Sequence, residues 1–325
     1  MTSGADSWRP TASLATLRAR AAALAATREF FRTRDVLEVE TPALVNAPVS
    51  DVNLGNLRVE MPGMPPLYLH TSPEYAMKRL LAAGSGNIYQ ICRVFRGAER
   101  GRQHNPEFTM VEWYRLGFSL EMLMREVADL VRLLLGPEAA GLPLELVSYR
   151  EAVRAHAGFD PLDAGRDALV AAGCALGLDS RRAAAAERDE LLDLVIGAQV
   201  GPALGAKALT FLHRYPASQA ALARLDPDDP RVALRFELYY RGVELANGYH
   251  ELASGAEQRL RFAADLKMRT QRGLPAATLD PNLLAALDAG LPDCAGVALG
   301  FDRLMMLAVG AESIDAVLAF PVERA

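Results

Sequence analysis

The sequence predicts an α+β fold in which helices flank a mainly antiparallel sheet. Strand-like and helical segments alternate irregularly along the chain, and two strand-like runs, 87–96 and 107–115, are joined by a polar loop typical of a long antiparallel hairpin. Residues 296–310 begin as a strand of small residues and turn into a helix near Asp302. A regular βαβ array would need stricter alternation, so a sheet built largely of hairpins is expected.

The N-terminal part is predicted to contain a helix followed by a strand. Residues 1–10 are predicted to form a flexible N-terminus. Residues 11–34 are predicted to form an amphipathic helix, because apolar residues recur between arginines. Residues 36–45 alternate β-branched residues with acids, which is typical of a strand. Pro42 interrupts its hydrogen bonding, so this strand is expected at an edge or a bend.

A second helix is predicted over 72–83. Ser72 is expected to cap it, and Pro73 and Glu74 occupy the first turn, where a missing N–H and a negative charge are favoured. A third helix is predicted over 119–135.

The length of 325 residues suggests about two domains of ~150 residues each, or one large domain with an insertion. The Ala- and charge-rich segment 137–210 predicts a helical insertion that covers one side of the sheet, within a catalytic domain spanning 11–325. Strand character returns over 231–252 and helical character over 254–272.

Composition excludes several classes of protein. The net charge of −5 argues against broad, charge-driven binding to nucleic acid, and no apolar run reaches the ~18 residues of a membrane span. The N-terminus lacks the features of a signal peptide, and three widely spaced cysteines (Cys92, Cys174, Cys294) make no disulfide framework, so a cytoplasmic location is expected. The sequence contains no GxGxxG, GxxxxGK[ST], HExxH or GxSxG motif.

The second strand of the hairpin carries a candidate ammonium site. Its two-residue period places Phe108, Met110, Glu112 and Tyr114 on one face. A carboxylate beside a phenol suits an ammonium group, since one supplies charge and the other a directed acceptor. The alternative is an exposed glutamate beside a half-buried tyrosine.

Two arginines are candidate phosphate ligands. Arg96 ends the first hairpin strand, and Arg303 follows a strand whose Gly296, Ala298 and Gly300 leave room for a ligand to approach the backbone. The alternatives are a solvated loop arginine and a core strand that is simply closely packed.

The segment GVELANGYHEL carries a candidate metal site. Glu244 and Glu251 would lie on opposite faces of a regular strand, but a bulge or turn at Asn247 and Gly248 would bring Glu244, Asn247 and Glu251 onto one face. Two carboxylates in one pocket need a cation, and Mg²⁺ with a nucleotide is the economical choice. The alternative is a hairpin with two exposed acids.

Taken together, these segments resemble the catalytic domain of class II aminoacyl-tRNA synthetases of the lysyl branch, over roughly residues 11–325. VFRGAERGRQHNPEFTMVEWYR resembles motif 2 of that family, GVALGFDRLMML resembles motif 3, and LEVETPALV resembles the dimer-forming motif 1. TSPEYAMKRLL and GVELANGYHEL match two further lysyl-branch segments.

The resemblance implies an ATP- and Mg²⁺-dependent ligase that activates an amino acid as its adenylate. Arg96 and Arg303 would hold the α- and γ-phosphates and act as the catalytic residues. The implied nucleotide-binding residues are Arg96, Gly97, Ala98, Glu99, His104, Asn105, Phe108, Glu244, Leu245, Gly300 and Arg303. The implied substrate-binding residues are Ser72, Pro73, Glu74, Glu112, Tyr114, Asn247, Glu251 and Ala298, and the implied magnesium ligands are Glu244 and Glu251.

Two departures from the lysyl pattern matter. Only about ten residues precede the first expected helix, so no anticodon-binding barrel and no tRNA anticodon contact are expected. The position that usually holds a glutamate in motif 2 is Ala98, so its adenine contact is expected at Glu99 or at backbone groups.

Size and motifs together resemble the lysyl-tRNA synthetase paralogs that join (R)-β-lysine to a lysine side chain of elongation factor P. This implies elongation factor P as acceptor, (R)-β-lysine or lysine as substrate, and a homodimer through motif 1. Ala298, where lysyl enzymes tend to have Gly, is expected to tune α- against β-lysine. Three alternatives remain: a free-standing core that charges tRNA, a non-catalytic amino-acid sensor, and a small-molecule amide ligase.

Overall fold

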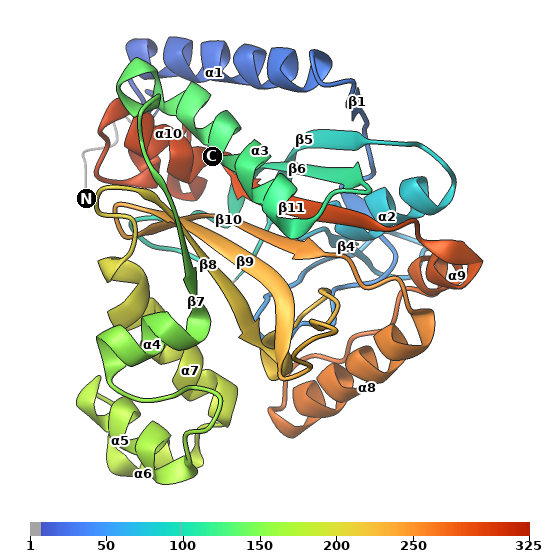
Figure 1. Ribbon diagram of the computed structural model, residues 1–325. Helices are drawn as coiled ribbons and strands as arrows, with labels where there is room; N and C mark the ends of the chain where they lie inside the picture. The colour runs from blue at the N-terminus through green and yellow to red at the C-terminus, as the bar shows by residue number, and fades with distance from the viewer. Residues whose placement is uncertain (1–7, 98) are drawn as a thin grey trace.

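The computed structural model describes residues 8–97 and 99–325 (Figure 1). Most of the expected flexible N-terminus, and Ala98 among the expected nucleotide ligands, therefore lie outside the described residues. The large sheet consists of β1 (Leu37–Glu38), β5 (Ile88–Phe95), β6 (Glu107–Leu116), β7 (Leu144–Ser148), β8 (Leu209–Pro216), β9 (Val232–Tyr240), β10 (Val243–His250) and β11 (Cys294–Gly300). Its order is β1-β5-β6-β11-β10-β9-β8-β7, and all neighbours are antiparallel except β1–β5 and β7–β8.

The remaining elements surround this sheet and confirm the α+β class. A smaller sheet has the order β2-β4-β3 and consists of β2 (Leu44–Val45), β3 (Leu57–Val59) and β4 (Leu67–Leu69). The helices are α1 (Leu14–Arg32), α2 (Glu74–Ala82), α3 (Leu120–Leu135), α4 (Tyr149–Ala157), α5 (Arg166–Ala175), α6 (Ser180–Ala185), α7 (Arg188–Val195), α8 (Gly255–Gln271), α9 (Pro281–Gly290) and α10 (Phe301–Val309). In the described residues, no helix is long and apolar enough to cross a membrane.

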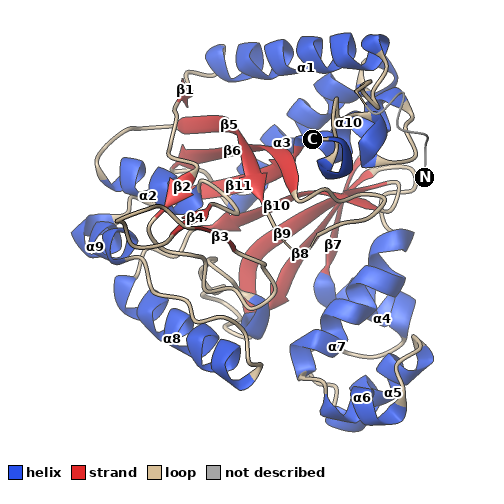
Figure 2. Ribbon diagram, turned by 180° about the vertical axis from the view of Figure 1, so that it is seen from behind, coloured by secondary structure: helices blue, strands red, loops and turns tan. Residues whose placement is uncertain are grey.

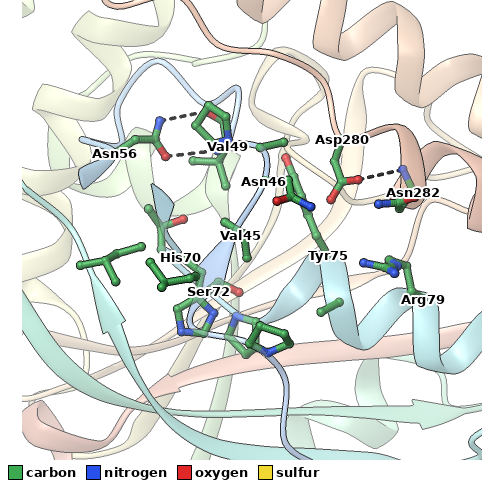
Figure 3. A pocket seen from close by; sticks show the side chains of 18 residues that line it. Val45, Asn46, Val49, Asn56, His70, Ser72, Tyr75, Arg79, Asp280 and Asn282 are labelled. Atoms are coloured by element: carbon green, nitrogen blue, oxygen red, sulfur yellow. Dashed lines mark hydrogen bonds between the residues drawn. The ribbon is translucent and has the colours of Figure 1, made fainter. Parts of the chain in front are cut away.

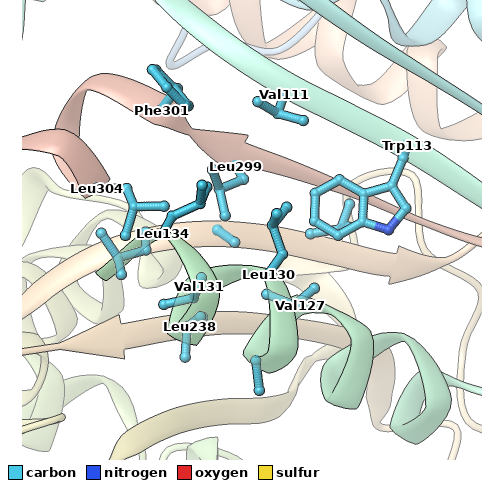
Figure 4. Packing of buried hydrophobic residues seen from close by; sticks show 14 of the residues in the cluster. Val111, Trp113, Val127, Leu130, Val131, Leu134, Leu238, Leu299, Phe301 and Leu304 are labelled. Carbon is cyan, nitrogen blue, oxygen red and sulfur yellow. The ribbon is translucent and has the colours of Figure 1, made fainter. Parts of the chain in front are cut away.

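One face of the large sheet packs against α3 and forms the main core (Figure 4). Helix α3 begins where Ser119 accepts a hydrogen bond from the Met122 amide, and its apolar stripe then faces the sheet. Trp113 of β6 is fully buried there and donates its indole N–H to Glu126 of α3 at 3.1 Å. Odd-numbered residues of β6 therefore fill the core, and even-numbered residues face the other side of the sheet.

The smaller sheet and α2 lie on that other side, and the smaller sheet is drawn in front of the large sheet in Figure 2. Helix α2 begins at Glu74, slightly later than predicted, with Pro73 as the residue before it. The Ser72 hydroxyl accepts a hydrogen bond from the Glu74 amide at 3.0 Å. The Ser-Pro-Glu turn thus fixes where the first helical side chain points.

Two predicted segments differ from expectation. Residues 36–45 form two short strands, β1 and β2, in different sheets, because the chain bends around Pro42. The segment 137–210 is not purely helical, because β7 pairs with β8 at the edge of the large sheet before α4 begins. Figure 1 shows α4–α7 as a lobe at one end of the molecule, and Tyr149 and Val153 pack against the β8 side chains Leu212 and Tyr215.

The β9–β10 hairpin corrects the expected bulge. The turn lies at Arg241 and Gly242, which have φ of 50° and 70°, as a two-residue hairpin turn requires. The register shifts between Glu244 and Ala246, whereas Asn247 and Gly248 continue the strand. The prediction of a bulge at Asn247–Gly248 was therefore wrong. The register shift earlier in the strand nevertheless places Glu244 on the same face as Asn247, as expected.

Candidate active site

Cross-strand pairing places the candidate residues on one face of the sheet. Ala298 of β11 pairs with Glu112 of β6 on one side and with Asn247 of β10 on the other. Asn247 pairs with Glu237, and Glu244 pairs with Tyr239, two residues further along β9. Residues directly opposite one another share a face, so Glu112, Ala298, Asn247 and Glu244 all face the side away from α3.

Glu112 is the centre of a buried acid pocket. Its side chain receives a hydrogen bond from the Ser72 hydroxyl on Oε2 and from the Tyr114 hydroxyl on Oε1, both at 2.7 Å. Glu112 and Tyr114 are each 2% exposed, so an exposed glutamate beside a half-buried tyrosine was the wrong alternative. Burial raises the pKa of Glu112 to about 8, with a further contribution from Glu74, while the two hydrogen bonds oppose the shift.

A second acidic group of the pocket is built around Lys78, which the sequence motifs did not single out. The Lys78 Nζ lies 2.7 Å from Glu74 Oε1 and 2.7 Å from Glu251 Oε2. Burial alone would lower the pKa of Lys78, but the two carboxylates outweigh it and the pKa is raised. Burial raises the pKa of Glu251 to about 7, against the opposing effect of Lys78. Glu74 and Lys78 are four residues apart on one helix, which is the signal in the sequence that could have revealed the pair.

The floor of the pocket is backbone at Gly296. A Cβ at this position would lie 2.3 Å from the Tyr114 ring and 2.5 Å from Glu251 Oε1. Only glycine allows these two side chains to approach the strand so closely. The small residues of β11 therefore make room for pocket side chains as well as for packing.

Arg303 marks the opposite end of the same face, in the first turn of α10. Its Nη1 donates to the Glu244 carbonyl oxygen at 3.1 Å and lies 3.3 Å from Glu244 Oε2. Its Nε donates to the Gln103 carbonyl oxygen, and its Nη2 contacts His104 Nε2. The guanidinium thus connects the motif 2 loop, β10 and motif 3.

Arg96 lies at the start of the motif 2 loop. Its guanidinium carbon is 5.1 Å from the centre of the Phe108 ring, and its Nη1 is 3.5 Å from Glu99 Oε1. Its Nε is buried without a hydrogen-bond partner in the part of the chain that the structure describes. A loop arginine surrounded by solvent would not have this environment.

Glu99 and His104 connect the two arginines: Glu99 lies 3.5 Å from Arg96 and 3.9 Å from His104 Nε2, which Arg303 contacts. Burial lowers the pKa of His104, and Arg303 and Arg96 lower it further. Burial also raises the pKa of Glu244, with Glu237 adding to the shift and both arginines opposing it. Arg96 and Arg303 therefore act on the same two groups, as a pair of phosphate ligands would require.

The other expected nucleotide ligands have varied environments. Leu245 and Gly300 lie together, since a Cβ on Gly300 would be 3.7 Å from the Leu245 carbonyl oxygen. Gly97 packs against the Leu57 side chain. Asn105 is buried and its amide is used within the protein, accepting from the Val322 amide and donating to the Glu107 carbonyl oxygen, so its contact with a nucleotide stays a prediction.

Glu244 and Glu251, the two expected magnesium ligands, have different cationic neighbours in this structure. Glu244 faces Arg303, and Glu251 faces Lys78 at the other end of the pocket. No group of three or more metal-ligating side chains occurs among residues 8–97 and 99–325. Glu244, repelled by Glu237 and partly accessible, fits a magnesium ligand, and a contact of Glu251 with magnesium stays a prediction.

A cavity of about 120 Å³ adjoins the acid pocket (Figure 3). It lies between the smaller sheet, α2 and the start of α9. Of the candidate site residues, Ser72 and Pro73 line it. Since neither Arg96 nor Arg303 lines it, this cavity is a neighbour of the candidate site and not the site itself.

An antiparallel sheet with this hairpin, and with an arginine at the start of the helix after its central strand, defines a class II aminoacyl-tRNA synthetase fold. The chain belongs to that family: the family model described as "tRNA synthetases class II (D, K and N)" matches residues 5–324. Within the family, it is similar to proteins named elongation factor P–(R)-β-lysine ligase. Those of Klebsiella pneumoniae (strain 342) and Salmonella dublin are each 50% identical to it over 323 residues, covering 98% of both chains.

Proposed function

We propose that this protein is a ligase that uses ATP to activate (R)-β-lysine and then transfers it to a lysine side chain of elongation factor P. The name of its 50% identical relatives supports this acceptor and this amino acid. The observation that carries the proposal is the arrangement of one sheet face: a buried acid pocket around Glu112 at one end and two arginines at the other.

The acid pocket suits the two amines of the substrate. Glu112 and Tyr114 form one acceptor group, and Glu74 and Glu251 form another. A carboxylate and a phenol oxygen both accept hydrogen bonds from an ammonium group. Ala298 lies between Glu112 and Asn247 in the sheet, where its methyl group borders the substrate chain.

The arginine end suits the triphosphate of ATP. Arg96 and Arg303 are guanidiniums in fixed surroundings, and such groups stabilise the charge that develops on phosphate oxygens. The substrate carboxylate oxygen attacks the α-phosphorus, the bond to the β-phosphate oxygen breaks, and pyrophosphate leaves. Holding both reactants on one rigid sheet supplies much of the rate.

In the second step the neutral amine of the acceptor lysine attacks the activated carbonyl carbon. The bond to the AMP oxygen breaks, AMP leaves, and the amine loses a proton as the amide forms. Glu244 is the residue we propose as a magnesium ligand, and Mg²⁺ at this position would neutralise phosphate charge.

Three further properties belong to the same proposal. Leu37 and Leu44 of the motif 1 segment are 58% and 40% exposed, which supports a homodimer interface there. Cys92, Cys174 and Cys294 are free thiols, which suits the cytoplasm. The third property is that no contact with a tRNA anticodon is needed, because the acceptor is a protein, as in the name of the relatives.

The test is the intact mass of elongation factor P after incubation with this protein, ATP and (R)-β-lysine. We expect a gain of one lysyl residue that requires ATP, and no gain with the Arg303→Ala variant. A parallel reaction with lysine and total tRNA detects the alternative of a free-standing synthetase core. Charged tRNA with unmodified elongation factor P would overturn the proposal.

A further inference from the structure

Lys78 is unusual among the basic residues of this chain. Only three of the 35 basic residues are lysines, at positions 78, 207 and 267. Lys207 and Lys267 are exposed, whereas Lys78 is 2% exposed. A buried ammonium is costly unless it is fully paired, so its presence in the acid pocket requires an explanation.

Lys78 contacts one oxygen of each of the two neighbouring carboxylates. Its Nζ lies 2.7 Å from Oε1 of Glu74 and 2.7 Å from Oε2 of Glu251. Both oxygens of Glu251 are buried without a hydrogen-bond partner within the described residues: Oε2 has only its ion pair with Lys78, and Oε1 lies against the backbone of Gly296. The ammonium therefore fixes both acids while leaving one oxygen of Glu251 without a partner inside the pocket.

With all its carboxyl groups ionised, the pocket has an excess of negative charge until a ligand binds. Glu74, Glu112 and Glu251 carry three negative charges when all are ionised, and Lys78 supplies one positive charge, so two negative charges remain. A buried site is most favourable when the bound ligand completes the balance. Two ammonium groups complete it, and one does not.

We propose that Lys78 is a positioning residue that serves as a permanent third ammonium: it orients Glu74 and Glu251 and sets the pocket to accept a ligand with two ammonium groups. This inference rests on the proposed function, which supplies a diamino acid as the substrate. It adds a residue that determines specificity without touching the reacting atoms.

Lysine suits this position better than arginine. An ammonium is a compact point charge that fits between two carboxylate oxygens at 2.7 Å each. A guanidinium is a planar fork that would engage both oxygens of one carboxylate, which would remove the free oxygen on Glu251. The chain otherwise uses arginine for nearly all of its ion pairs, so size is the physical reason for lysine here.

The test is a double-mutant cycle with Lys78→Met, Glu74→Gln and the double variant. Dissociation constants for L-lysine, (R)-β-lysine and norleucine are measured by calorimetry, and KM and kcat by ATP–pyrophosphate exchange. Each single variant is expected to weaken binding of the diamino acids, mainly through KM. The double variant again leaves two net negative charges in the pocket. Its loss of affinity for the diamino acids should therefore be smaller, by about tenfold, than the product of the two single losses.

The preference for lysine over norleucine provides an independent readout, because norleucine has one ammonium group. We expect Glu74→Gln, with Lys78 intact, to reduce this preference by about tenfold, and the double variant to restore part of it. Lys267→Met on the surface of α8 is the matched control and should behave as wild type. Thermal unfolding of every variant separates loss of folding from loss of binding.

If the affinity losses of the two single variants simply multiply in the double variant, the role proposed for Lys78 is overturned. An unchanged preference for lysine over norleucine in Glu74→Gln would also overturn it. If Lys78→Met does not fold, Lys78→Arg decides the question: it keeps the charge but would engage both oxygens of one carboxylate, so it should weaken binding of the diamino acids, and unchanged binding would overturn the role of Lys78. A wild-type protein that binds neither lysine nor (R)-β-lysine would instead overturn the proposed function, so the two failures are distinguishable.

Discussion

Gly296 and Tyr114 are paired across β11 and β6, and the tyrosine ring lies so close that a Cβ on Gly296 would come within 2.3 Å of it. The same Cβ would lie 2.5 Å from Glu251 Oε1. One backbone position thus determines whether the phenol and the carboxylate can occupy the pocket together.

Gly296→Ala is therefore expected to displace Tyr114 or Glu251 and to raise the KM for the amino acid by about tenfold or more, with little change in the KM for ATP. Pyrophosphate exchange with each substrate varied in turn measures both values. Gly141→Ala is the control for a glycine outside the site, because a Cβ there would have no atom within 4 Å. An unchanged amino-acid KM in Gly296→Ala would contradict the pocket.

Ala298→Gly tests the discrimination between the two lysines. The residue pairs with both Glu112 and Asn247, so its methyl group borders the substrate site. Removing one methyl group changes discrimination by ~1–3 kcal/mol, so the ratio of adenylation rates for (R)-β-lysine and α-lysine should shift towards α-lysine by about tenfold. The same ratio in wild type and variant would refute this role for Ala298.

Arg96→Ala and Arg303→Ala are each expected to lower pyrophosphate exchange by about 10²-fold or more, through loss of a charge-assisted phosphate contact. Arg93→Ala is the control, because Arg93 is exposed on β5 and pairs with Glu107. Exchange at the wild-type rate in either Arg96→Ala or Arg303→Ala would exclude that residue from the nucleotide site.

The pKa of Glu112, raised to about 8 by burial and by Glu74, predicts a pH dependence of substrate binding. The carboxyl is neutral below this pKa, and an ammonium group binds its ionised form more tightly. The KM for the diamino acid should therefore fall by about tenfold as the pH rises from ~6 to ~8.

Glu112→Gln should weaken binding and remove most of this pH dependence, because its amide does not titrate. The residual dependence belongs to Glu251, whose pKa burial raises to about 7. The KM for ATP, measured in parallel, serves as the control. A KM for the amino acid that rises with pH over this range would show that another group controls binding.

Local patterns were sufficient to predict much of the fold. The two-residue period of β6 separated Trp113, which enters the core, from Glu112 and Tyr114, which face the pocket. The strand-to-helix transition was predicted near Asp302 and lies one residue earlier, at Phe301, because small residues followed by an amphipathic run are a local signal.

Other features depended on contacts between distant segments. The bulge at Leu245 was predicted two residues too late, because its position depends on pairing with β9 and not on the Asn-Gly dipeptide. The strand β7 was missed because five residues at a sheet edge are defined by their partner β8.

Local motifs were enough to define the class of chemistry, since Arg96, Arg303, Glu112 and Tyr114 are the right groups within recognisable segments. The charge balance of the pocket depends on folding, because Lys78 on a helix and Glu251 beyond a strand lie 173 residues apart (251 − 78 = 173) and meet at 2.7 Å only in the folded chain. Burial then converts an ordinary lysine into a fixed counter-charge, since the cost of desolvating an ion depends on the three-dimensional surroundings and not on its neighbours in the chain.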